Sequence, residues 1–422
     1  MPDSKDINIY MDSLGSSAKR ASRILSQASV EQKNSALLSI AEKIDLKRQD
    51  ILKENQHDLA EAKKKEIGDA LIDRLELTQD RIDSMISGLK VVSELPDPVG
   101  EITNLKPTPS GIDVSKMRVP LGVVGIIYES RPNVTADAAA LCLKSGNSCI
   151  LRGGSEAILS NKIIWQCLQE GLDESGLPKE CIQLVEIIDR AAVKSLLQMD
   201  KWIDVIIPRG GKGLVKLISE ESRVPVIKHL DGICHVYIDL DSDPEKSIDI
   251  AFNAKTYRYG ICGAMETLLI HEEVASRILP KLLDKYNAEG VEIRGCEVTQ
   301  KIIKVKAAND EDWTTEYLAP VLSIKVVKGL EEAIEHINLY GSSHTDSIVT
   351  ENDENVAIFF DKVDSSSVMH NLPTCWADGF EYGLGAEVGI STDKIHARGP
   401  VGLEGLTSQK FIVKGNSQLR GS

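Results

Sequence analysis

The sequence predicts an α/β protein built from two doubly wound α/β domains and a β-arm. Short apolar runs rich in β-branched residues alternate with helical stretches between residues 122 and 227, and again between residues 235 and 369. This alternation indicates mostly parallel sheets covered by helices. The chain has 422 residues, more than one ordinary hydrophobic core accommodates, so two or three domains are expected.

The first part of the chain, residues 8–95, is predicted to be helical. The pattern Ser29-Val30-Glu31-Gln32 is a capping box, in which the serine accepts from an early backbone N–H and the glutamine reaches back. Two apolar stripes at helical spacing indicate helix faces directed at a core: Leu37, Leu38, Ala41 and Ile44, and Ile82, Met85, Ile86 and Leu89. Pro96 and Pro98 are expected to end the second helix.

Residues 101–118 are rich in Pro, Gly and Thr and alternate in polarity, which predicts an extended arm or hairpin rather than a helix. The run Gln409–Val413 near the C-terminus is predicted to pair with this arm as a strand. Because the arm interrupts two globular regions, we expect it to make contacts in an oligomer.

The other strands are predicted from two series of apolar runs. The first series is Gly122–Tyr128, Ser148–Leu151, Ile182–Ile187, Val205–Ile207 and Val224–Ile227, and the second is His235–Leu240, Glu266–His271, Val321–Val327, Ser347–Val349 and Ser366–Met369. Helices are expected between them at Ala136–Lys144, Ala157–Glu170, Gly213–Glu220, Glu273–Tyr286, Leu330–Ile337 and Asn355–Val363. Ligands of such sheets bind at the carboxyl ends of the strands.

Composition excludes several classes of protein. The formal net charge of −15 and the pI of about 5.1 disfavour nucleic acid as a partner, because the surface repels phosphate backbones. The eight cysteines form no Cys-x-x-Cys pair, so neither a zinc ribbon nor a disulfide framework is predicted, and no metal site is expected. A polar N-terminus and the lack of a long apolar run predict a soluble, cytoplasmic protein without a membrane partner.

Cys262 is the predicted centre of the chemistry. It lies in a turn of small residues, Gly260-Ile261-Cys262-Gly263-Ala264, directly before an apolar run. The glycines leave room for a substrate to reach the sulfur and for backbone N–H groups to point at the atom that it attacks. Lys255 and Arg258 precede the cysteine closely, and nearby cations lower a thiol pKa. The alternative is a small buried hydrophobe, the commonest role of an unbridged cysteine.

Three loops that follow predicted strands are candidate ligand sites. Their sequences are Ser130-Arg131-Pro132-Asn133-Val134-Thr135, Ile150-Leu151-Arg152-Gly153-Gly154-Ser155-Glu156 and Pro208-Arg209-Gly210-Gly211-Lys212-Gly213. Glycines allow a ligand to approach the backbone, and a helix that starts in the loop favours negative charge, so two such loops favour a dinucleotide. The alternatives are tight turns that need glycine and, for Asn133, a helix N-cap. The sequence lacks both a Walker A motif and a Gly-x-Gly-x-x-Gly after a strand, which disfavours kinases and ATPases.

Together these stretches, with Asn253-Ala254-Lys255-Thr256, Glu266-Thr267 and the segment 381–387, resemble the aldehyde dehydrogenase superfamily in the same order from about residue 8 to residue 415. Within it they are similar to the branch that reduces the acyl phosphate of glutamate. The resemblance implies an aldehyde dehydrogenase-like fold. It assigns residues 1–100 with 122–235 to a cofactor-binding domain, 236–370 to a catalytic domain, 101–121 with 400–415 to an oligomerisation arm, and 371–399 to a return segment.

The resemblance also implies roles for individual residues. Cys262 would be the nucleophile, and Asn133 would form the oxyanion hole with the Cys262 N–H. The cofactor-binding residues would be Arg152, Gly153, Gly154, Arg209, Gly210, Gly211, Lys212 and Glu316, with Arg152 placed to accept a 2′-phosphate and Glu316 to hold the nicotinamide ribose. Arg131, Lys255 and Arg258 are candidates for binding the substrate.

One stretch departs from the superfamily. Hydrolytic members carry a glutamate that activates water against the thioester, and the corresponding stretch here reads His229-Leu230-Asp231-Gly232. Without that carboxylate the thioester is not preferentially hydrolysed, which suits an enzyme that exchanges it with phosphate. His229 would still be able to act as a base.

The implied reaction is the NADPH-dependent reduction of L-glutamyl 5-phosphate to L-glutamate 5-semialdehyde and phosphate, the second step of proline biosynthesis from glutamate. The expected partners are this small molecule, a second copy of the chain in a dimer or tetramer, and a functional contact with glutamate 5-kinase. The alternatives are another superfamily member that oxidises a semialdehyde, a catalytically silent homologue that serves as a scaffold, and a bifunctional protein with glutamate kinase activity.

Overall fold

A computed structural model describes residues 4–105 and 108–420 of the chain. The chain divides into two units. Unit 1 comprises Met1–Lys228, Leu384–Gly389 and Val401–Ser422, and unit 2 comprises His229–Gly383 and Ile390–Pro400. Each is described by itself below.

The N-terminal part of unit 1 is helical, as predicted. Its helices are α1 (Ser4–Leu25), α2 (Val30–Leu46), α3 (Arg48–Lys64), α4 (Asp69–Leu75) and α5 (Gln79–Glu94). Ser29 caps α2 by accepting from the Gln32 N–H. The expected return contact is wrong, because the Gln32 amide donates to the carbonyls of Ser175 and Gly176 and so ties α2 to the turn after α7 (Ile158–Glu174).

The two predicted apolar stripes lie in the core of unit 1, with one exception. All four residues of the stripe on α5 are buried, as are Leu37, Ala41 and Ile44 on α2. Leu38 is 49% exposed, so its inclusion in the stripe was wrong. Leu38 lies about 100° further round the helix than Leu37, outside the buried face of α2, which consists of Lys33, Ala36, Leu37, Ile40, Ala41 and Ile44.

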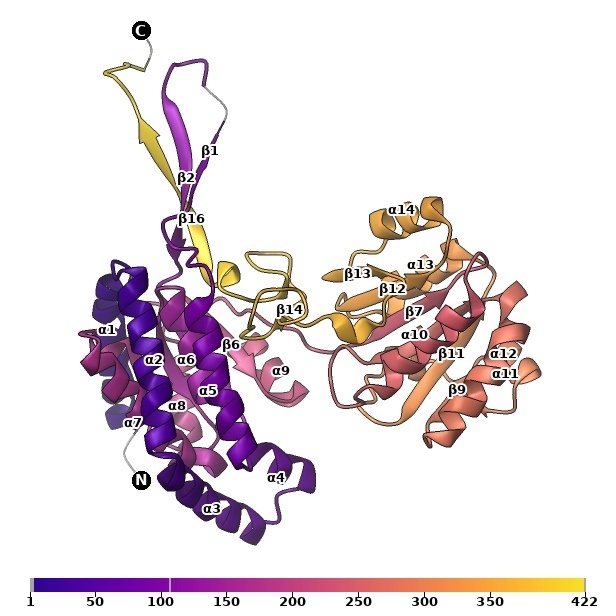
Figure 1. Ribbon diagram of the computed structural model, residues 1–422, viewed down its shortest axis with the longest axis horizontal. Helices are drawn as coiled ribbons and strands as arrows, with labels where there is room; N and C mark the ends of the chain where they lie inside the picture. The colour runs from indigo at the N-terminus through magenta and orange to yellow at the C-terminus, as the bar shows by residue number, and fades with distance from the viewer. Residues whose placement is uncertain (1–3, 106–107, 421–422) are drawn as a thin grey trace. The chain divides into compact units, whose positions relative to one another are not determined.

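The arm has the predicted strand structure (Figure 1). β1 (Ile102–Asn104) pairs antiparallel with β2 (Asp113–Pro120), and β2 pairs antiparallel with β16 (Thr407–Lys414) along its full length. The predicted hairpin and the predicted pairing of Gln409–Val413 with it are therefore confirmed. Residues 106–107 of the predicted arm lie outside the described residues.

A parallel sheet with strand order β5-β4-β3-β6 forms the centre of unit 1. Its strands are β3 (Val123–Tyr128), β4 (Ser148–Arg152), β5 (Ile182–Leu184) and β6 (Val205–Arg209). The strand predicted at Val224–Ile227 was wrong: within the described ranges it makes one isolated bridge, between Val226 and Ile206. The chain passes beside β6 too briefly there to form a ladder.

Helices cover both faces of this sheet. They are α6 (Val134–Lys144), α7, α8 (Arg190–Leu197) and α9 (Lys212–Glu221), together with the N-terminal helices. The side chains of Val123, Ile127, Ile150 and Ile206 pack in one cluster with residues of α1 and α8. Sequence patterning did not predict α8, which has only eight residues and follows the capping residue Asp189.

Unit 2 contains a second parallel sheet with strand order β10-β9-β11-β8-β7-β12-β13. Its strands are β7 (Cys234–Ile238), β8 (Met265–His271), β9 (Glu292–Gly295), β10 (Lys306–Ala307), β11 (Val321–Val327), β12 (Thr345–Val349) and β13 (Ser367–His370). All five strands predicted for this region are confirmed, and β9 and β10 were not predicted. A short antiparallel pair, β14 (Ile390–Ser391) with β15 (Gly399–Pro400), also belongs to this unit.

The helices of unit 2 are α10 (Pro244–Thr256), α11 (Glu272–Ala288), α12 (Glu297–Ile302), α13 (Leu330–Tyr340) and α14 (Asp353–Lys362). Alternate residues of the sheet face different helices, as the period of a strand requires. Leu268 and Ile270 pack with α10 and α11, whereas Leu269 packs with α13 and α14. Because both faces are covered, β8 contains the uninterrupted apolar run Leu268-Leu269-Ile270. None of the helices in the described ranges combines the length and apolar character needed to span a bilayer.

Candidate active site

The three predicted ligand loops of unit 1 follow neighbouring strands of one sheet. Ser130–Asn133 follows β3, Gly153–Gly154 follows β4, and Gly210–Gly211 follows β6, in a sheet where β3 lies between β4 and β6. Because the strands are parallel, their carboxyl ends share one edge of the sheet. The N-termini of α6 and α9 also lie at this edge, where the helix dipoles favour an anion.

The loop after β3 is held by a carboxylate. Ser130 adopts a positive φ of 38°, and Glu156 accepts hydrogen bonds from both its N–H and its hydroxyl at 2.7 Å. Asn133 occupies the N-cap position of α6, but its side chain does not cap the helix. Its Nδ2 instead donates to Asp137 Oδ2 at 2.8 Å. The capping alternative for this side chain is therefore wrong, and Asn133 is oriented by Asp137.

Asp137 is a positioning residue that sequence reasoning missed. Desolvation by the surrounding protein raises the pKa of its carboxyl to about 6, although the hydrogen bond from Asn133 and the charge of Arg209 both lower it. The sequence does contain a signal for this contact: Asp137 lies four residues after Asn133, which places the two side chains one helical turn apart.

The loop after β4 carries Arg152, which is 9% exposed. Its guanidinium donates to the carbonyls of Gly153 at 2.6 Å and Ile188 at 3.1 Å, and burial lowers its pKa. Within the described ranges its Nε has no hydrogen-bond partner. A Cβ on Gly153 would lie 2.2 Å from Asn161 Nδ2, so glycine is needed for packing inside the loop as well as for any ligand.

The loop after β6 also depends on a carboxylate. Glu129 Oε2 accepts from the Gly211 N–H at 2.8 Å, and a Cβ on Gly210 would lie 2.6 Å from the same oxygen. Lys212 begins α9 and is exposed, and Arg209 ends β6. Since Glu129 occupies the Gly211 N–H, other atoms of this loop would have to contact a bound dinucleotide.

In unit 2, Cys262 lies in the turn between α10 and β8 and is partly exposed, unlike the buried Cys234 beside it. No disulfide joins the cysteines, all eight of which lie in the described ranges. The turn packs tightly against the segment before β7: a Cβ on Gly232 would lie 2.0 Å from the Cys262 carbonyl oxygen. That oxygen also accepts from Cys234 Sγ at 3.1 Å. Close packing therefore fixes the backbone from which the Cys262 side chain projects.

Lys255 forms a fully buried ion pair with Glu266 at 2.5 Å, and Glu266 also accepts from the Leu318 N–H at 3.2 Å. Burial lowers the pKa of Lys255 and raises the pKa of Glu266, while their mutual attraction opposes both shifts. This pair disfavours the predicted contact between Lys255 and a substrate. Arg258, by contrast, lies in the exposed part of the turn. Arg131 of unit 1 is half-buried.

Glu316 lies before β11 in unit 2 and is half-buried. Its Oε1 accepts from the Gly232 N–H at 2.9 Å, so Glu316 contacts the segment against which the Cys262 turn packs. The predicted role of Glu316 in cofactor binding therefore concerns a residue that also contacts the segment packed against the Cys262 turn.

Two histidines lie beside the cysteine. One ring nitrogen of His229, one of His344 and Cys262 Sγ all lie within 4.8 Å of one another. His344 was not predicted, because it lies directly before β12 and no local motif marks it. Burial lowers the pKa of His344 to about 3, so its imidazole is neutral. The imidazole rings of His229 and His344 meet edge to face, with their centroids 5.3 Å apart.

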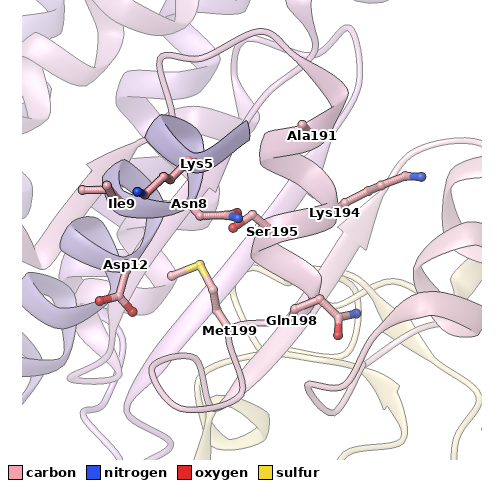
Figure 2. Close-up of a pocket in the computed structure, with 9 residues that line it drawn as sticks. All are labelled: Lys5, Asn8, Ile9, Asp12, Ala191, Lys194, Ser195, Gln198 and Met199. Carbon is pink, nitrogen blue, oxygen red and sulfur yellow. The ribbon is translucent and has the colours of Figure 1, made fainter. Parts of the chain in front are cut away.

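A pocket of about 810 Å³ lies elsewhere in unit 1, between α1 and α8 (Figure 2). Its lining residues are Lys5, Asn8, Ile9, Asp12, Ala191, Lys194, Ser195, Gln198 and Met199. None of the predicted site residues is among them. In Figure 2 the side chains of Lys5 and Lys194 point away from each other and do not converge on a common point, so we assign no function to this pocket.

Comparison with known proteins identifies the family of this chain and several solved relatives. The sequence profile of the aldehyde dehydrogenase family matches residues 11–294. The solved gamma-glutamyl phosphate reductase of Thermotoga maritima is 42% identical, with a TM-score of 0.95 and coverage of 97% of this chain and 99% of that chain. The gamma-glutamyl phosphate reductase of Saccharomyces cerevisiae is 32% identical, with a TM-score of 0.54 and coverage of 98% and 99%.

An acetylating aldehyde dehydrogenase from Geobacillus thermoglucosidasius shares the fold at 16% identity, with a TM-score of 0.70 and coverage of 100% of both chains. The family profile spans well over half of the sequence, and two relatives above 30% identity are matched over nearly their whole length. The predicted aldehyde dehydrogenase-like fold is confirmed, and the chain belongs to the aldehyde dehydrogenase family.

Proposed function

We propose that the protein reduces L-glutamyl 5-phosphate to L-glutamate 5-semialdehyde and phosphate, using NADPH and a thioester on Cys262. The observation that carries the proposal is the similarity, over almost the whole chain, to two solved gamma-glutamyl phosphate reductases. The reaction is the second step of proline biosynthesis from glutamate. Because the cysteine is partly exposed and fixed by its turn, it suits the role of nucleophile.

In the proposed reaction the Cys262 thiolate attacks the acyl carbon, and the C–O bond to phosphate breaks. Asn133 and the Cys262 N–H would stabilise the oxyanion that forms during the attack. The thioester accepts a hydride, and the resulting thiohemiacetal releases the semialdehyde and restores the thiol. Phosphate is a good leaving group, so little acid catalysis is needed. His229, in place of the glutamate of hydrolytic relatives, leaves the thioester without a carboxylate to activate water.

The carboxyl-end edge of the unit 1 sheet fits a dinucleotide. Two helix N-termini favour an anion there, and the buried Arg152 has an Nε with no hydrogen-bond partner among the described residues. Arg152, Gly153, Gly154, Arg209, Gly210, Gly211 and Lys212 would hold the cofactor, and Glu316 would bind the nicotinamide ribose. Arg152 is our candidate for the 2′-phosphate that distinguishes NADP from NAD. A bound nicotinamide cofactor supplies the hydride.

For the substrate, Arg131 and Arg258 are the candidates that the geometry favours, since Lys255 already has a buried carboxylate partner. Residues 1–100 with 122–235 would act as the cofactor-binding domain and 236–370 as the catalytic domain, with 371–399 as the return segment. We further propose that 101–121 with 400–415, the region of β1, β2 and β16, joins copies of the chain into a dimer or tetramer. We also propose that the protein makes a functional contact with glutamate 5-kinase and that it is located in the cytoplasm.

The reverse reaction tests this function directly. Semialdehyde, NADP and phosphate are supplied together, and each is then omitted in turn while NADPH formation is followed. We expect formation to require all three, and Cys262→Ala to abolish it. Cys375→Ser, which changes another partly exposed cysteine of unit 2, should retain activity. NADPH formation without phosphate would instead identify a hydrolytic aldehyde dehydrogenase, and activity in Cys262→Ala would refute the thioester mechanism.

A further inference from the structure

The cluster of His229, Cys262 and His344 has the composition of a metal site. One nitrogen from each imidazole and the thiol sulfur lie within 4.8 Å of one another. They come from three segments that precede β7, β8 and β12, which are neighbours in the sheet of unit 2. Histidine nitrogen and cysteine sulfur are both ligand types that bind zinc.

Hydrogen bonds hold both imidazoles through Nδ1. His229 Nδ1 lies 3.0 Å from the Ile390 carbonyl oxygen, and His344 Nδ1 lies 2.9 Å from Thr345 Oγ1 and 3.6 Å from Cys234 Sγ. The Nε2 of His344 is buried and has no hydrogen-bond partner in the described part of the chain. Coordination through Nε2 would leave the Nδ1 contacts intact. Metal-bound histidines usually make such a contact at the second ring nitrogen, because it fixes the orientation of the ring.

The surroundings also favour a cation. The residues precede their strands, so they lie at the edge of the sheet where the preceding helices end: α10 ends at Thr256 before Cys262, and α13 ends at Tyr340 before His344. A helix C-terminus carries partial negative charge.

We propose that His229, Cys262 and His344 bind one divalent ion of the zinc type, which inhibits the protein by occupying the thiolate. Tetrahedral coordination at zinc distances of about 2.0–2.3 Å places ligand atoms roughly 3.3–3.8 Å apart, so the cluster would contract by about 1 Å. Rotation of the partly exposed Cys262 and His229 side chains provides this movement while the backbone of the turn stays in place, and water or a substrate oxygen would complete the coordination. Binding exchanges the thiol proton for the metal–sulfur bond and releases that proton to solvent.

Direct binding tests the site without any substrate. The full-length protein is titrated with Co²⁺, and the near-ultraviolet thiolate-to-cobalt absorption is recorded before Zn²⁺ is added as a competitor. We expect one Co²⁺ per chain with a thiolate band, displaced by Zn²⁺. His344→Ala and His229→Gln should each weaken the affinity by at least about tenfold, and Cys262→Ser should abolish the band.

His336→Ala is the matched control. His336 is also buried in unit 2 and also has an Nε2 with no hydrogen-bond partner in the described ranges, but it lies outside the cluster. Its variant should bind Co²⁺ as the unmodified protein does. Circular dichroism establishes that each variant is folded. If His344→Ala does not fold, His229→Gln, a change at a half-buried position, still tests the site. A spectrum without the band, or one unchanged by Cys262→Ser, overturns the proposal.

Inhibition is then measured with the proposed reaction. Zn²⁺ should lower the rate, and a chelator should restore it. This part alone rests on the proposed function, so failure of that function leaves the cobalt titration interpretable. Metal binding without any loss of rate would overturn the inhibitory role.

Discussion

The two sheets of this protein use opposite edges for their candidate site residues. In unit 1 the loops around Asn133, Gly153 and Gly210 follow their strands and lie at the carboxyl ends, where helices begin. In unit 2, Cys262 and His344 precede their strands and lie at the amino ends, where helices stop. The first edge favours an anion and the second a cation. Similar parallel sheets therefore provide electrostatic surroundings of opposite sign.

The two edges also differ in how their loops are held. In unit 1, carboxylates accept from backbone N–H groups: Glu156 from Ser130 and Glu129 from Gly211. In unit 2, the turn of Cys262 is fixed by backbone that packs against Gly232 without space for a side chain. Side-chain carboxylates therefore hold the loops of unit 1, whereas backbone packing holds the turn of unit 2.

Asn133→Ala has the largest expected effect and tests whether the site edge of unit 1 also contributes to the chemical step. If this unit 1 residue donates to the oxyanion, kcat should fall by about 10²–10³ while the KM for NADP changes little. Steady-state kinetics with semialdehyde, NADP and phosphate measures both constants. Asn338→Ala, an exposed asparagine on α13, serves as the control. A rise in KM at constant kcat would show that Asn133 serves only the cofactor.

Gly232→Ala tests whether backbone packing positions the sulfur. The added Cβ would lie 2.0 Å from the Cys262 carbonyl oxygen, so the turn must shift, and misplacing a reacting atom by about 1 Å can cost about 10²-fold in rate. Rapid-mixing measurement of Cys262 acylation reports the loss. Gly329→Ala adds the same methyl group elsewhere in unit 2, where nothing lies closer than 3.8 Å, and should leave the rate unchanged. Normal acylation in Gly232→Ala would contradict this account of the turn.

Glu129→Ala removes the carboxylate that holds the Gly211 N–H. A hydrogen bond to a charged group contributes about 1.5–3 kcal/mol, and partial exposure reduces this, so we expect the KM for NADP to rise about tenfold at constant kcat. Titration of NADPH fluorescence provides an independent affinity. An effect on kcat alone would instead indicate that Glu129 contributes to the chemical step and not to cofactor binding.

The smallest expected effect concerns Asp137. Its pKa is raised to about 6, so the carboxylate that orients Asn133 is present above that pH and becomes protonated as the pH falls through it. Protonation weakens the hydrogen bond from Asn133, and kcat should fall by about two- to tenfold, the contribution of one ordinary hydrogen bond. The pH profile of Asp137→Asn should lack this step near pH 6. If the pH profile of Asp137→Asn is identical to that of the unmodified protein, Asp137 does not influence the reaction.

Much of the fold was predictable because its causes are local. The alternation of β-branched runs with helical stripes identified β3, β4, β5, β6, β7, β8, β11, β12 and β13, and the alternating polarity near residue 110 identified the arm. The errors have local causes too. The run Val224–Ile227 has strand composition but pairs with β6 at one point only, and α8 is too short to show a period.

The sequence by itself determined the residue types at the site: a cysteine between small residues, an asparagine after a strand, and loops of glycine with arginine or lysine. Tertiary structure alone decided which groups touch. The strand order β8-β7-β12 brings His344 to Cys262, and burial pairs Lys255 with Glu266 rather than leaving it for a substrate. Periodicity depends on neighbouring residues in the chain, whereas these contacts depend on the order of strands in a sheet, which no local pattern records.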